Sequence, residues 1–216
     1  MCLGIECSYY SPEELARAFN KNDQVKETER KLERNRLLFV GSMDYQANID
    51  AVVWFGDRVW PELSHRLPQL LFTVVGRDPS TAVIKLAAIP RIEVTGWVAD
   101  VRGFYHDALA AVVPLHFGSG TRIKILEAMA ANVPVVSTSA GAEGLDVLPD
   151  VHYLAAETPE DFRLAIENLH SDSPLRKRLT MNARRLVEKR YDWKLIGSRL
   201  RSIYCGALNL HAQSTA

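Results

Sequence analysis

Short apolar runs that end in glycine or proline recur along the chain and alternate with longer helical stretches. The runs at residues 37–40, 70–75, 92–94, 110–114 and 133–137 read as buried strands, with a weaker one at 152–154. Helices are expected at 48–66, 81–88, 101–107, 121–131, 159–169, 174–189 and 193–204. This alternation predicts an α/β fold, with a Rossmann-like parallel sheet and helices on both faces.

In such a sheet, ligands bind beyond the carboxyl ends of the strands. The loops at this edge are expected at 41–48, 76–79, 96–100, 116–121 and 138–145. Any single glycine here could simply end a strand. Together these loops predict one ligand-binding edge. No strand is followed by G-x-G-x-x-G, which argues against an NAD-dependent dehydrogenase.

Composition excludes several classes of protein. Lysine plus arginine equals aspartate plus glutamate, 26 against 26, so the chain lacks the basic excess typical of nucleic-acid binding. No apolar run is long enough to span a bilayer, and no secretory leader is recognisable. The three cysteines form no CxxC pair, and no His/Cys cluster has zinc spacing. We therefore expect a cytoplasmic protein without a metal.

The densest chemical signal is the segment 118–130, where a glycine-containing loop leads into a helix. Free amides and the positive dipole end make such a helix start an anion site. Arg122 and Lys124 in the first turn oppose the helix dipole, at roughly 0.3–1 kcal/mol each. A bound diphosphate would reverse this cost. The alternative is that both are solvated and pair with Glu143 or Asp146.

Glu127 lies on the same helix, five residues after Arg122. Its two carboxylate oxygens match the two vicinal hydroxyls of a ribose. The alternative is an ordinary surface charge.

These motifs resemble the C-terminal domain of the GT-B-fold, family 4 (group 1) glycosyltransferases. The likeness runs from about residue 37 to 204 and is strongest over 118–130. Further matching segments are 38–43, 48–52, 75–77, 95–102, 113–115, 134–138, 141–145 and 190–193. Residues 4–12 resemble the linker that enters this domain.

The resemblance implies a role for each matching position. Glu127 matches the last glutamate of the E-x7-E motif, which holds the ribose. His116 matches a position that contacts the diphosphate or sugar, although a passive loop histidine is an equal alternative. The remaining donor-binding positions are expected in three loops: Gly41 and Ser42 near the phosphates; Gly96, Trp97, Val98 and Ala99 around the nucleobase; and Gly118, Ser119, Gly120 and Thr121 along the diphosphate and sugar.

Two departures from the family pattern stand out. Ser119 occupies the position of the first glutamate of E-x7-E, which normally contacts sugar hydroxyls. The loop after the first strand lacks the arginine and lysine that many members carry there. We therefore expect Arg122 and Lys124 to be the catalytic residues that hold the diphosphate.

The resemblance also predicts three segments. Residues 1–36 are expected to be the linker from an N-terminal acceptor domain, which this sequence lacks. Residues 37–190 form the donor-binding domain, and 191–216 a crossover helix and tail. Trp193, Ile196, Leu200 and Ile203 share one face of that helix, so we expect self-association or packing back on the domain.

The implied reaction is transfer of a sugar, with retention, from a nucleoside diphosphate donor to an acceptor hydroxyl in bacterial polysaccharide biosynthesis. The acceptor would be a sugar or a lipid-linked sugar, reached by an enzyme peripheral at the inner face of the membrane. No cofactor is expected beyond the donor. The alternatives are a non-catalytic nucleotide-sugar-binding module and half of a nucleotide-sugar epimerase.

Overall fold

The computed structural model describes residues 4–21, 34–118 and 120–214, with side chains to Cys205. In this part of the chain, six strands form one sheet in the order β3-β2-β1-β4-β5-β6, and every neighbouring pair is parallel. The strands are β1 (Arg36–Val40), β2 (Leu71–Val75), β3 (Ile92–Gly96), β4 (Ala108–Val113), β5 (Val135–Ser137) and β6 (Leu154–Ala155).

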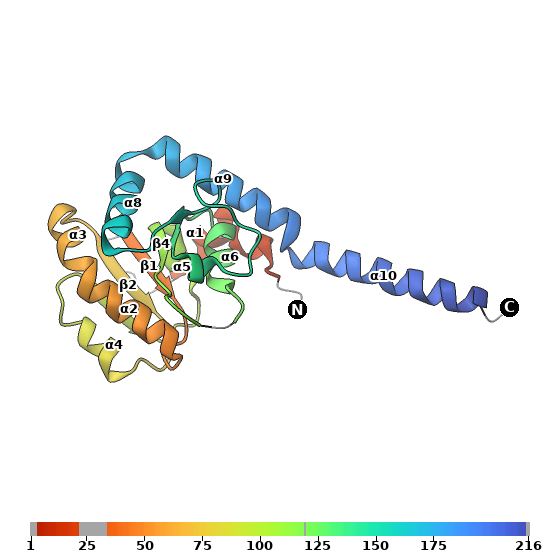
Figure 1. Cartoon of the computed structure of the whole chain (residues 1–216), viewed down its shortest axis with the longest axis horizontal. Coiled ribbons are helices and arrows are strands. Elements are labelled where there is room, and N and C mark those ends of the chain that lie inside the picture. Colours follow the sequence, from red (N-terminus) through yellow and green to blue (C-terminus); the bar gives the residue numbers. More distant parts are fainter. Residues whose placement is uncertain (1–3, 22–33, 119, 215–216) are drawn as a thin grey trace.

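Helices surround this sheet (Figure 1). They are η1 (Cys7–Tyr10), α1 (Pro12–Lys21), α2 (Gln46–Arg58), α3 (Trp60–Arg66), α4 (Thr81–Leu86), α5 (Arg102–His106), α6 (Ile123–Ala130), α7 (Ser139–Ala142), α8 (Pro159–Ser171), α9 (Ser173–Arg190) and α10 (Trp193–Ser214). The predicted Rossmann-like α/β fold is confirmed.

The central strands carry the core. All six residues of β4 are buried, and Leu37, Leu38 and Phe39 of β1 are almost fully inaccessible. The helices add large buried side chains such as Phe55 and Phe162. Continuous apolar runs suit strands that have helices on both faces.

The helices differ from prediction in two places. The stretch 48–66 is two helices rather than one, with a break at Val59. Pro61 lies in the first turn of α3, where its missing N–H costs nothing, whereas inside a continuous helix it would remove a hydrogen bond. The predicted loop 138–145 contains the short helix α7, which Thr138 caps by accepting a hydrogen bond from Gly141 N.

The N-terminal segment packs on the domain. Helix α1 begins at Pro12, which suits the first position of a helix because its missing N–H costs nothing there. Ile5, Tyr10 and Leu15 belong to the same buried cluster as the sheet. Ile5 N donates to Tyr191 O at 2.7 Å, which links this segment to the C-terminal helices. The predicted linker 1–36 also includes 1–3 and 22–33, which lie outside the described residues.

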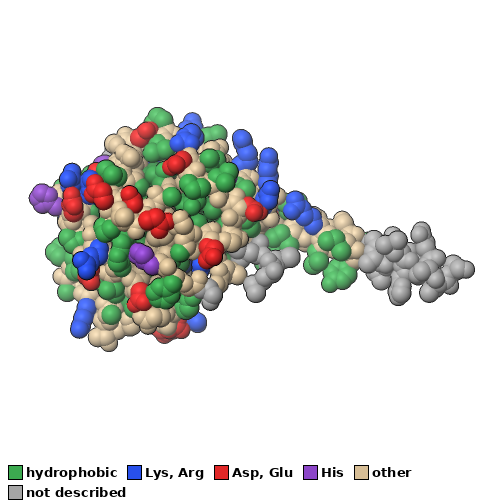
Figure 2. Space-filling model, in the orientation of Figure 1, with side chains coloured by type: hydrophobic (Ala, Val, Ile, Leu, Met, Phe, Trp, Pro, Cys, Tyr) green, Lys and Arg blue, Asp and Glu red, His purple; other side chains and the backbone are tan. Residues whose placement is uncertain are grey.

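Helix α10 projects from the body of the molecule (Figure 1). Trp193, Leu200 and Ile203 are 49%, 47% and 68% exposed, and Ile196 is half-buried. Figure 2 shows hydrophobic side chains along the described part of this projection. Among the described residues, no helix combines the length and apolar character that crossing a membrane requires.

Candidate functional site

The order of the strands places the candidate site. β1 and β4 are neighbours, but the chain runs from β1 toward β2 on one side and from β4 toward β5 on the other. A crevice opens where the strand order reverses in this way, and ligands bind there in open α/β sheets. Residues 41–45 and 114–122 form the two loops that flank it.

The loop after β1 is packed closely against the loop after β2. Gly41 N donates to Val75 O at 3.0 Å, and a Cβ added to Gly76 would overlap the carbonyl oxygen of Gly41. A Cβ added to Gly41 would lie 3.0 Å from Lys124 Nζ. Both glycines therefore permit close approaches.

Lys124 reaches the loop after β1 from α6. Its Nζ donates to Asn48 Oδ1 at 2.6 Å and lies 4.1 Å from the centre of the Phe39 ring. No carboxylate of the described residues forms an ion pair with it. Burial, followed by the neighbouring Arg122 charge, lowers its pKa from 10.5 to about 7. A lysine in this setting gains strongly from a bound anion.

Arg122 precedes the first residue of α6 and is 7% exposed. Its Nη2 donates to Gly118 O at 2.8 Å and Ala140 O at 2.9 Å, and lies 3.7 Å from the exposed Glu143 carboxylate. Its Nε is buried with no hydrogen-bond partner among the described residues. Arg122 therefore fixes the loop after β4. The alternative was that Arg122 is solvated and pairs with Glu143 or Asp146. The structure shows the contact with Glu143, but the arginine side chain is buried rather than solvated.

The loop after β4 has the backbone expected of an anion cradle. Gly118 and Gly120 have φ of +127° and +129°, a region that favours glycine. A Cβ at Gly118 would lie 3.0 Å from Tyr45 Oη, so this loop approaches the loop after β1. Arg122 gives α6 no side-chain cap, and the first turn is closed by backbone bonds instead, from Ile123 N to Thr121 O at 2.6 Å and from Ile125 N to Arg122 O at 3.0 Å. Ser119 lies outside the described residues, and Thr121 is exposed.

Glu127 is held by two tyrosines. Tyr10 Oη donates to Glu127 Oε1 at 2.8 Å, and Tyr105 Oη donates to Oε2 at 3.3 Å. Burial raises the pKa of the Glu127 carboxyl, while the two hydroxyls and Lys124 act in the opposite direction. The alternative of an ordinary surface charge is wrong, because this carboxylate is largely enclosed.

His116 lies exposed on the loop after β4. Its ring meets Trp54 edge to face, with the centroids 4.6 Å apart, and Trp54 also packs on Phe162 at 5.7 Å. Trp54 itself is half-buried. It anchors the loop histidine as well.

The predicted nucleobase turn follows β3. Gly96 has φ of +71°, and its carbonyl accepts from Gly76 N at 3.2 Å. Trp97 is 70% exposed, Val98 is half-buried and Ala99 is exposed. The structure records no contact between this turn and Glu127 or Lys124.

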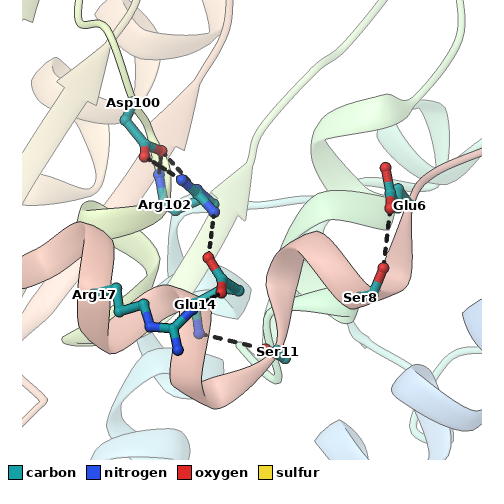
Figure 3. Close-up of polar contacts among 7 residues, drawn as sticks. All are labelled: Glu6, Ser8, Ser11, Glu14, Arg17, Asp100 and Arg102. Atoms are coloured by element: carbon teal, nitrogen blue, oxygen red, sulfur yellow. Dashed lines mark hydrogen bonds and ion pairs between the residues drawn. The ribbon is translucent and has the colours of Figure 1, made fainter.

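An arginine cluster fixes the end of this turn (Figure 3). Arg102 Nη2 donates to Asp100 at 2.7 Å, and its Nη1 donates to Glu14 of α1 at 3.2 Å. Its guanidinium also lies 3.8 Å from the centre of the Tyr9 ring. The N-terminal segment thus contacts Glu127 directly and is linked through Arg102 to Asp100, which follows the predicted nucleobase turn.

The family model of the group 1 glycosyl transferases matches residues 34–172. The chain belongs to this family. The structure of the C-terminal domain of LpcC, a group 1 family glycosyl transferase from Francisella tularensis, aligns with a TM-score of 0.67 at 19% identity, over 88% of this chain and 100% of that one. HepE from Anabaena, solved with UDP-glucose, aligns with a TM-score of 0.64 at 17% identity. The alignment covers 94% of this chain and 56% of HepE.

A curated relative is the uncharacterised 44.6 kDa protein of the cps region of Klebsiella pneumoniae. It is 24% identical over 178 residues, which are 76% of this chain and 44% of that protein. The chain therefore spans less than half the length of this relative. The activity of a whole group 1 glycosyltransferase is accordingly a proposal for this chain.

Three residues of this group 1 glycosyltransferase site were not singled out from the sequence. Asn48 of α2 contacts Lys124. Tyr105 of α5 and Tyr10 of η1 both contact Glu127. Asn48 stood inside a quoted family motif, which is the signal that could have found it. No spacing pattern links the tyrosines to Glu127.

A metal has no evident place in the described part of this glycosyltransferase domain. In residues 4–21, 34–118 and 120–214, no group of three or more His, Cys, Asp or Glu side chains is placed to hold an ion. Binding of the donor without a metal stays a prediction.

Proposed function

We propose that the crevice between the loops after β1 and β4 binds the diphosphate of a nucleotide sugar. The observation that carries this proposal is Lys124, a largely enclosed ammonium beside Gly41 and Asn48 that forms no ion pair with a carboxylate in the described part of the chain. An enclosed cation of this kind is costly unless an anion joins it. The positive φ angles of Gly118 and Gly120 also support this proposal, because glycines let a loop approach a ligand closely.

In the intact enzyme this crevice would stabilise the leaving group. As the bond from the sugar to the diphosphate breaks, negative charge grows on the phosphate oxygen. Lys124 and Arg122 would offset that charge with groups that are already oriented. Glu127 would hold the ribose, and residues 96–99 would receive the base, which keeps the donor in place.

The remaining features of the reaction belong to this proposal as well. We infer transfer with retention to a hydroxyl of a sugar or lipid-linked acceptor. The acceptor would be bound by another domain, with the enzyme cytoplasmic and peripheral at the membrane. The UDP-glucose bound by HepE supports a nucleoside diphosphate sugar as the donor class. Ser119, in place of the sugar-binding glutamate, favours a non-catalytic binding module as the second candidate.

Ligand screening by thermal shift tests the binding function. UDP, GDP, ADP and their sugars are added at millimolar concentration in the presence of EDTA. At 100 times its dissociation constant, a ligand stabilises the folded chain by roughly 2.7 kcal/mol. We expect at least one clear rise in Tm. No shift with any of these ligands would overturn the proposal.

Transfer assays separate the two candidates. A protein that carries this domain together with an acceptor domain is given the donor found by screening and a panel of acceptor sugars. Sugar transfer would support the enzyme. Donor binding without transfer or donor hydrolysis would support the binding module.

The exposed face of α10 gives a further prediction. Leu200 and Ile203 are about half and two-thirds exposed on a helix that projects from the domain. We expect the chain to form a dimer in light scattering, and Leu200→Ser with Ile203→Ser to yield a monomer that still binds nucleotide. Arg199→Ser, an exposed change on the same helix, is the control. A wild-type chain that is monomeric at all concentrations would contradict self-association.

A further inference from the structure

Tyr10 belongs to the N-terminal segment, yet its hydroxyl lies in the nucleotide site. It is 5% exposed, and it reaches Glu127 across 117 positions of sequence. Its ring packs edge to face on Tyr105, with centroids 6.0 Å apart. Arg184 of α9 donates to the carbonyl of Tyr10 at 3.3 Å and to that of Cys7 at 3.0 Å, so the backbone around Tyr10 is fixed independently of Glu127.

The Tyr10 and Tyr105 hydroxyls leave Glu127 able to accept more. An ionised carboxylate has about four lone-pair sites, two on each oxygen. Tyr10 takes one on Oε1 and Tyr105 one on Oε2. One site on each oxygen is left, which matches the two vicinal hydroxyls of a ribose. The tyrosines also set the plane of the carboxylate, and therefore the direction of the free sites.

We propose that Tyr10 is a positioning residue of the donor site, which orients the Glu127 carboxylate toward the ribose and keeps it ionised. This inference rests on the proposed function. The same segment also contacts Arg102 through Glu14, and Arg102 is bonded to Asp100 at the end of the predicted nucleobase turn (Figure 3). The N-terminal segment therefore supports the ribose and base subsites together.

The charge state of Glu127 gives this role a readout of its own. The groups that face its carboxylate are the hydroxyls of Tyr10 and Tyr105 and the ammonium of Lys124, and all three lower a pKa that burial raises. Removing the Tyr10 hydroxyl removes one of these effects. The pKa of Glu127 should then rise further, and a carboxyl that protonates at higher pH loses its ribose bonds at higher pH.

The experiment compares Tyr10→Phe with Tyr204→Phe. Tyr204 lies on α10 and is 63% exposed, away from Glu127. Affinity for the nucleoside diphosphate found by screening is measured from pH 5 to 8. The titration of the Glu127 carboxyl is followed by NMR without ligand. Tm values check that both variants are folded.

We expect roughly tenfold weaker binding in Tyr10→Phe, as for loss of a hydrogen bond to a charged group. We also expect its acidic loss of affinity, and the Glu127 titration, to move to higher pH. Tyr204→Phe should match the wild type in all measurements. If Tyr10→Phe binds the nucleotide as tightly as the wild type, and the Glu127 carboxyl titrates at the same pH, the role of Tyr10 alone is overturned. A wild type that binds no nucleotide would overturn the proposed function, and this role with it.

Discussion

Replacing Lys124 by methionine is expected to weaken diphosphate binding about a hundredfold while making the folded chain more stable. A charge-assisted contact to a phosphate is worth roughly 1.5–3 kcal/mol. Methionine keeps the length of the side chain and its packing over Phe39, but removes the ammonium. Binding should therefore fall because the enclosed charge that faces the diphosphate is gone.

The stability effect has the opposite sign and depends on pH. The pKa of Lys124 is about 7 in the folded chain, against 10.5 ordinarily. Between these values the unfolded chain binds more protons, so the free energy of unfolding rises with pH across this window. Below pH 7 the full cost of the buried charge applies. Methionine removes both the cost and the slope.

The size of this effect can be bounded. The full shift would correspond to roughly 5 kcal/mol at about 1.4 kcal/mol per pKa unit. We expect about 3 kcal/mol at pH 6, because water can approach the ammonium and methionine leaves Asn48 Oδ1 without its donor. Denaturant unfolding at pH 6 and 10 measures the difference between Lys124→Met and the wild type.

Lys85 supplies the matched control. It is an exposed lysine on α4, so Lys85→Met should change neither stability nor binding. Calorimetry should use the nucleotide sugar, because a diphosphate esterified at both ends does not itself titrate near neutral pH. A Lys124→Met variant that is less stable than the wild type at pH 6, or that binds the donor equally well, would contradict this account of the site.

The sequence predicted the positions of Lys124 and Glu127 but not their surroundings. The glycine loop before α6 and the charges in its first turns pointed to an anion site without any tertiary information. The partner of Lys124 could not be predicted in the same way. Asn48 is 76 positions away, and the two meet because β1 and β4 are neighbours in the sheet. Periodicity reveals strands but not the order in which they pair.

Two predicted elements, the helix at 48–66 and the strand at 152–154, differ from the structure for reasons that lie in the nearby sequence. The break between α2 and α3 follows from Pro61, which was visible in the sequence, but an apolar stripe running through residues 48–66 suggested one helix. The last strand is β6 at Leu154–Ala155 rather than 152–154, because only two residues pair with β5 and the pattern there is weak. Such short pairings are set by the neighbouring strand.

Replacing Glu127 by alanine should separate the ribose subsite from the phosphate subsite. The ribose is common to a nucleoside and its diphosphate, so Glu127→Ala is expected to weaken both by similar factors. Two hydrogen bonds to a charged carboxylate would be lost, which corresponds to about a hundredfold. Lys124→Met should instead weaken the diphosphate much more than the nucleoside. Calorimetry measures the affinity of each variant for each of the two ligands, relative to the wild type.

Two details make this comparison decisive. Glu62→Ala, an exposed carboxylate on α3, is the control and should leave all affinities unchanged. Glu127→Gln keeps an acceptor oxygen but is neutral at every pH, so it should remove the acidic loss of affinity seen in the wild type. Because burial raises the pKa of Glu127, that loss should begin at higher pH than for an ordinary glutamate. If Glu127→Ala spares the nucleoside and weakens only its diphosphate, Glu127 does not hold the ribose.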